Sequence, residues 1–85
     1  HEGNKKWYAV LMRISWDKLE KGREGLVEAV NLKHDQVADL LSKKGIYPAF
    51  HMNKRYWISV ALDDTLSDEE VLELMEKSWN LTSKK

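Results

Sequence analysis

The C-terminal part of the chain constrains the fold most, because its pattern is that of a single amphipathic helix. Ser67 is followed three residues later by Glu70, which is the capping-box pattern at a helix start. Acids crowd the first turn, where the helix dipole favours negative charge. An apolar stripe follows at helical spacing, formed by Val71, Leu72, Leu74, Met75 and Trp79. Such a helix needs an apolar surface to cover, and the rest of the chain must supply it.

Four earlier segments are rich in β-branched and aromatic residues and are typical of strands. They are residues 6–13, 26–32, 46–52 and 56–62. Between the second and the third, Asp35 is placed to cap a short helix. Val37, Leu40 and Leu41 would form the apolar face of that helix, and Gly45 would end it.

The order of these segments is β-β-α-β-β-α, so we expect one α+β domain over residues 1–85. It should have two layers, an antiparallel sheet of about four strands and two principal helices. Pro48 indicates that the third strand lies at a sheet edge or starts pairing only after the proline. The first strand has apolar residues on both faces, so we expect it to be central or covered on both sides. Trp16 should anchor the charged connection after it. The predicted core is Trp7, Val10, Leu11, Val30, Leu40, Ile58, Val60, Leu72, Met75 and Trp79.

Composition excludes several classes of site. The chain has no cysteine, so it has no disulfide or thiolate metal site, which fits a reducing compartment. Apolar runs are short and there is no signal-peptide pattern, so we expect a cytoplasmic protein that does not cross a membrane. The histidines have no metal-ligand spacing. His51 has no nucleophile or cofactor motif beside it, although Ser59 or Asp63 can be imagined there. We therefore expect no catalysis, metal or cofactor.

Residues 51–57, HMNKRYW, gather side chains that are suited to recognition. Asn53 and Lys54 fit the centre of a tight hairpin that would pair His51 with Tyr56. One interpretation is structural: a hairpin with aromatic cross-strand pairs and a charged tip. The other is functional: a basic tip, flanked by aromatics, that contacts phosphates or stacks on bases.

Charge is unevenly distributed, although 14 basic and 14 acidic residues give a net charge of zero. Residues 40–62 contain no acid, whereas residues 63–76 contain seven acids and no base. A nucleic acid would therefore be contacted at the hairpin, weakly and without sequence preference, because the net charge and the acidic helix oppose binding. The candidate contact residues are Asn53, Lys54 and Arg55 at the tip, His51 beside it, and Lys43 and Lys44 nearby. The alternative is a protein-interaction or accessory module that acts through an exposed sheet face or the acidic helix.

Three strings in order, NLKHD, GIYPAFHMNKRYWISVALD and SDEEVLELMEKSWNLT, resemble the MmcQ/YjbR family of small bacterial proteins. The resemblance covers roughly residues 5–82. It implies a frataxin-like or secretion-chaperone-like antiparallel sheet and a DNA-binding module, with no catalytic activity to transfer. Tyr56 departs from the family, since many members have a second histidine there. Family members also carry an N-terminal helix that this chain starts too late to include. Without that helix, an apolar face of the first strand would be left uncovered. We therefore expect this face to be covered by self-association or by a longer native chain.

Overall fold

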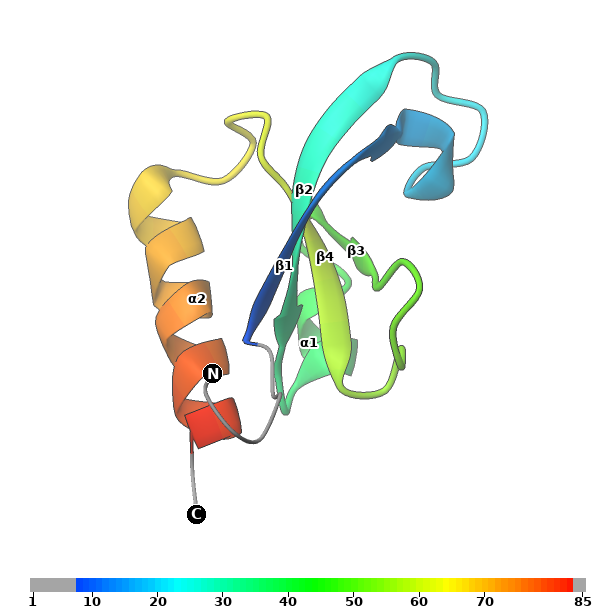
Figure 1. The fold of residues 1–85 in the computed structure, drawn as a ribbon. Helices are drawn as coiled ribbons and strands as arrows, with labels where there is room; N and C mark the ends of the chain where they lie inside the picture. Colours follow the sequence, from blue (N-terminus) through cyan, green and yellow to red (C-terminus); the bar gives the residue numbers. More distant parts are fainter. Residues whose placement is uncertain (1–7, 84–85) are drawn as a thin grey trace.

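The computed structural model describes residues 8–83, which form one antiparallel sheet with helices (Figure 1). The strands are β1 (Ala9–Ser15), β2 (Leu26–Lys33), β3 (Ile46–Pro48) and β4 (Trp57–Ala61). Their order across the sheet is β1-β2-β4-β3, and every neighbouring pair is antiparallel. A 3-10 turn (Trp16–Lys18) follows β1. Helix α1 (Val37–Leu40) lies between β2 and β3, and α2 (Asp68–Ser83) follows β4. The predicted α+β fold and its element order are confirmed.

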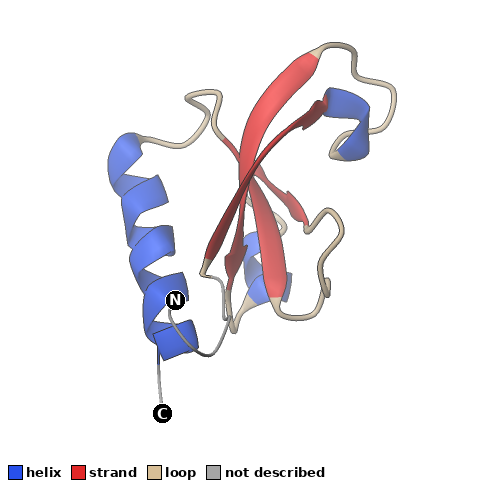
Figure 2. Cartoon of the chain, in the orientation of Figure 1, coloured by secondary structure: helices blue, strands red, loops and turns tan. Residues whose placement is uncertain are grey.

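Helix α2 covers one face of the sheet, beside β1 and β2 (Figure 2). The main core lies on this face and consists of Val30, Leu32, Val37, Ile46, Ile58, Val60 and Leu66. Ser78, which is buried on α2, accepts a hydrogen bond from the Lys33 backbone N–H at 2.8 Å and donates one to the Tyr8 carbonyl. These two bonds fix the helix to the first two strands. Among residues 8–83, no helix has the length and apolar character that crossing a membrane requires.

The capping box at the start of α2 is confirmed. The Ser67 backbone N–H donates to Glu70 Oε1 at 3.0 Å, and the Glu70 backbone N–H donates to Ser67 Oγ at 3.1 Å. Both bonds satisfy backbone donors that a helix start leaves without partners. This local sequence signal therefore sets where α2 begins.

The other face of the sheet carries a smaller cluster of Trp16, Val27 and Ala61, with Tyr47 packed against it. Trp16 is 6% exposed, as predicted for the anchor of the connection after β1. The Arg23 guanidinium lies 3.6 Å from the centre of the Trp16 ring, which is a cation–π contact. The charged connection is thus tied to the sheet by one aromatic side chain.

Strand β1 is an edge strand and not a central one. The predicted core is also partly wrong, because three of its residues are exposed. Leu11 is 75% exposed, Leu72 is 62% exposed and Trp79 is 45% exposed. Helix α2 buries its Val71, Leu74 and Met75 side against the core instead. Val30, Ile58 and Val60 are buried as predicted, and Val10, Leu40 and Met75 are partly buried. Trp7 lies outside the described residues.

Helix α1 has only four residues, so α2 is the single long helix within residues 8–83. Gln36 precedes α1 without a side-chain capping bond, and the predicted Asp35 cap is wrong. The Asp35 carboxylate instead lies 3.4 Å from Lys77 Nζ on α2. Gly45 has the positive φ expected of a stop residue, +92°, but a turn over residues 42–44 separates it from the helix. Pro48 ends β3, which is the other edge strand, as predicted.

Candidate nucleic-acid interface

The link between β3 and β4 is a loop of residues 49–56, so the predicted two-residue hairpin is wrong. Pairing between the two strands ends at Pro48, which lies opposite Ile58. This register differs from the one that would pair His51 with Tyr56. His51 has a φ of 62°, a left-handed conformation that is uncommon for residues other than glycine. The chain therefore leaves the sheet after Pro48 and forms a wider loop.

This loop is anchored to the sheet by a closed ring of three hydrogen bonds. Asn31 Nδ2 donates to the Phe50 carbonyl at 2.8 Å, and the Phe50 N–H donates to Ser59 Oγ at 3.0 Å. Ser59 Oγ donates in turn to Asn31 Oδ1. Asn31 and Ser59 are opposite each other on β2 and β4, and both are buried. Two buried polar side chains thus obtain their partners from the loop backbone, which explains why strand pairing stops there.

The tip of the loop is a turn organised by Asn53. Its carbonyl accepts hydrogen bonds from the N–H groups of Tyr56 and Trp57, at 3.1 and 3.0 Å. Its Oδ1 accepts the Arg55 N–H at 2.9 Å, which is an Asx turn. Lys54 and Arg55 are exposed at this tip, and neither makes an ion pair with a residue in the range 8–83. Two cationic side chains are therefore held outward on an ordered backbone.

Lys43 and Lys44 lie at the other end of the sheet and do not extend the tip. They precede β3, and the neighbouring Gly45 carbonyl accepts a hydrogen bond from the Ala61 N–H at the end of β4. The loop tip precedes the start of β4, so the length of this strand, about 15 Å, separates the two pairs of bases. Lys43 Nζ also lies 3.0 Å from Glu70 Oε2. The predicted patch is thus divided in two.

Lys33 is a base near the loop that sequence reasoning did not select. It lies at the end of β2, directly opposite Trp57 in the sheet register. The next residue, His34, donates its backbone N–H to the Tyr56 carbonyl at 2.8 Å, so the end of β2 and the loop are joined. Tyr56 is 49% exposed and Trp57 is half-buried. The one available signal was the alternation along β2, which places Lys33 on the same face as Asn31.

The side chains imagined beside His51 as catalytic partners are placed elsewhere. The Ser59 hydroxyl is fully buried and engaged in the anchoring ring. Asp63 follows the far end of β4, and its carboxylate accepts a hydrogen bond from the Thr65 N–H. The His51 ring lies 3.9 Å, centre to centre, from the Phe50 ring. Residues 8–83 also contain no group of three or more His, Asp or Glu residues that could hold a metal ion.

His34 is a buried histidine at the junction of β2, α1 and α2. Its Nδ1 accepts the Gln36 backbone N–H at 2.9 Å, which requires that nitrogen to be unprotonated. Burial lowers the pKa of His34 below its ordinary value of 6.5; Lys77 acts in the same direction, and Asp35 opposes both. The folded protein therefore favours neutral His34.

We expect this histidine to make folding pH-dependent. The unfolded chain binds a proton at His34 near the ordinary pKa, whereas the folded chain binds it only at lower pH, so stability should fall as pH drops below about 6.5. Urea denaturation at about pH 7.5 and about pH 5.5 measures the loss. His34→Gln should reduce the difference between the two pH values. An unchanged difference in that variant would contradict the prediction.

The comparisons with known proteins agree with this architecture. The chain is 37% identical over 84 residues to the uncharacterised Bacillus subtilis protein YyaQ, covering 96% of this chain and 71% of that protein. It is 40% identical over 58 residues to the uncharacterised Escherichia coli protein YbdF, covering 65% of this chain and 48% of that protein.

Solved structures are similar as well. A crystal structure of a Pseudomonas syringae protein superposes with a TM-score of 0.90 at 43% identity, over 96% of this chain and 72% of that one. A crystal structure from Deinococcus radiodurans gives a TM-score of 0.64 at 28% identity, over 91% of this chain and 62% of that one. The family model YjbR matches residues 2–81. With nearly the whole chain matched and relatives of this identity, the protein belongs to the YjbR family.

Proposed function

We propose that this domain binds nucleic acid weakly and without sequence preference, through the loop of residues 49–56. The proposal rests on the exposure and the charge of the Lys54 and Arg55 side chains. Both are exposed on an anchored loop, and neither has an acidic partner within the described part of the chain. By contrast, Lys43 and Lys77 are each paired with a carboxylate. Because the tip is not neutralised internally and residues 49–56 contain no acid, it is a surface suited to phosphate.

Side chains near the tip also favour nucleic-acid binding. Tyr56 and Trp57 offer partly exposed rings on which bases can stack, and Lys33 adds a base opposite Trp57. The Asn53 amide nitrogen is not engaged by another described residue, so it can donate to a phosphate oxygen. His51 adds a further polar ring beside the tip. The acids of α2 begin beyond the far end of β4, so they repel a polyanion least at this loop.

Binding should be weak and sensitive to salt. Two phosphate contacts, from Lys54 and Arg55, imply a log–log salt slope of about −1.8 on duplex DNA. Fluorescence anisotropy of a labelled duplex and a labelled single strand, titrated at low salt, measures both affinity and slope. We expect Lys54→Glu/Arg55→Glu to lose binding, with a dissociation constant at least roughly tenfold higher.

A matched control distinguishes the effect of the loop on binding from the effect of net charge. Lys18→Glu/Lys21→Glu makes the same change in net charge on exposed residues of the connection after β1. That variant should keep most of the binding. Equal binding by the parent and the loop variant would overturn the proposal, as would the absence of parental binding at about 1 mM protein. The proposed role is non-catalytic and needs no cofactor.

The second candidate function is protein interaction, and one observation favours it. Leu11 on the β1 edge and Leu72 and Trp79 on α2 are large apolar side chains that remain exposed. Exposed apolar surface of this kind is often covered by a partner. Such binding should change little with salt, whereas phosphate contacts weaken steeply, so the salt slope distinguishes the two functions.

A further inference from the structure

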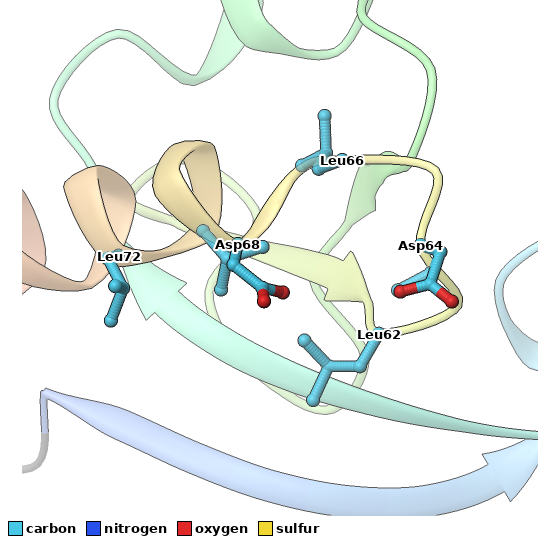
Figure 3. A pocket seen from close by; sticks show the side chains of 7 residues that line it. Leu62, Asp64, Leu66, Asp68 and Leu72 are labelled. Atoms are coloured by element: carbon cyan, nitrogen blue, oxygen red, sulfur yellow. The ribbon is translucent and has the colours of Figure 1, made fainter.

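An open apolar pocket lies where β4 leads into α2. Its volume is about 410 Å³. Ala61 and Leu66 form a buried part of its wall, while Leu62 and Leu72 are exposed at its mouth. Figure 3 shows Asp64 and Asp68 on either side of Leu62. The pocket therefore combines an apolar lining with two carboxylates.

The two carboxylates have no cationic partner in the described structure. Asp64 and Asp68 make no ion pair with any residue of the range 8–83, unlike Glu70, which binds Lys43. A cation bound between the two carboxylates would be attracted by both of them. The pocket is thus suited to a positively charged group that is attached to an apolar body.

The same chain presents such a group at its loop tip. Lys54 and Arg55 are exposed and unpaired among the described residues, and Tyr56 beside them is 49% exposed. We propose that the tip of one molecule docks in the Asp64–Asp68 pocket of a second copy. Arg55 or Lys54 would lie between the carboxylates, and the Tyr56 ring would cover Leu62 and Leu72. Charge and apolar character match on both sides of this contact.

The contact must form between molecules. The tip precedes β4 and the pocket follows it, so the five residues of this strand hold them about 15 Å apart in one chain. Each copy offers one tip and one pocket, which makes the contact head-to-tail, so it can extend from copy to copy. Since its charges are exposed, the association should be weak and should decrease with added salt. The proposal does not rest on nucleic-acid binding, although both contacts would use the tip.

The test uses charge reversal on each side of the contact in the full chain. The tip variant is Lys54→Glu/Arg55→Glu. The pocket variant is Asp64→Asn/Asp68→Lys, with asparagine at position 64 because φ there is 71° and asparagine tolerates it. Amide NMR spectra of the parent, recorded up to about 1 mM, should change with concentration at residues 53–57 and 61–72. Each variant alone should show association roughly tenfold weaker or none.

Mixing the two variants provides the decisive measurement. The negative tip of one fits the positive pocket of the other, so an equimolar mixture should regain the association, with shifts at both sites of the labelled pocket variant. Lys18→Glu/Lys21→Glu has the net charge of the tip variant but an intact tip and pocket, so it should associate like the parent. If the Asp68→Lys substitution prevents folding, the variant Asp64→Asn/Asp68→Asn should still weaken association.

Three outcomes would overturn the proposal. They are parental spectra that do not depend on concentration, shifts confined to another surface such as β1, and a mixture that stays monomeric. The pocket variant should bind DNA at least as tightly as the parent, because its tip is unchanged and its net charge is more positive. Loss of self-association and loss of nucleic-acid binding are therefore separate results.

Discussion

Replacing Asn31 with alanine is expected to lower the free energy of unfolding by about 2–4 kcal/mol. Asn31 is 1% exposed, and its side chain holds both the Phe50 carbonyl and the Ser59 hydroxyl. Alanine leaves both groups without that partner, and the Ser59 side chain is fully buried. Each unsatisfied buried group costs about 1–3 kcal/mol, compared with a net contribution of about 0.5–1.5 kcal/mol from a typical intramolecular hydrogen bond. Urea denaturation of the parent and the variant measures the loss.

Two further variants test whether the anchoring ring is the cause. Asn53→Ala changes an exposed asparagine in the same loop and should cost under about 1 kcal/mol. The double variant Asn31→Ala/Ser59→Ala should lose less than the sum of the single variants, because each single variant already breaks the bond between Ser59 and Asn31. Amide exchange over residues 50–57 should accelerate in Asn31→Ala. Stability within about 0.5 kcal/mol of the parent would show that the ring does not hold the loop.

Replacing Gly45 with alanine is expected to cost about 2–4 kcal/mol. The backbone at Gly45 has a φ of +92°, where a Cβ atom costs about 1–2 kcal/mol. A Cβ there would also lie 3.1 Å from Thr65 Cγ2 and 3.2 Å from Leu66 Cγ. Thr65 is exposed and can move, but Leu66 belongs to the main core, so its contact with the Cβ atom cannot be relieved into solvent. The bond from the Ala61 N–H to the Gly45 carbonyl, at 3.0 Å, would be disturbed as well.

Gly22 supplies the matched control for Gly45. Its φ is +88°, nearly the same, but a Cβ atom there would meet nothing within 4 Å. Gly22→Ala should therefore show the conformational cost alone, about 1–2 kcal/mol. The difference between the two variants measures the crowding against Thr65 and Leu66. Equal losses in thermal or urea denaturation would mean that packing at Gly45 is unimportant.

Sequence reasoning located the candidate site but not its form. The residue types at positions 51–57 show by themselves that this segment is basic and aromatic, so it could be selected without a structure. Its shape could not be predicted, because Asn53-Lys54 favours a tight turn locally while Asn31 and Ser59 bind Phe50 from strands far away in the chain. Long-range bonds to buried side chains outweigh a weak local turn preference. The ion pair between Lys43 and Glu70 could not be predicted either, because it also joins residues far apart in the chain.

Local sequence patterns were enough to predict the strand and helix order, the start of α2 at its capping box and the edge position marked by Pro48. These features depend on periodicity, capping and proline chemistry, which act over a few residues. Long-range packing sets the sheet order, the exposure of Leu11 and the anchoring of the loop over residues 49–56. Apolar periodicity identifies a face that can be buried, but which strand α2 covers depends on how all the elements pack together.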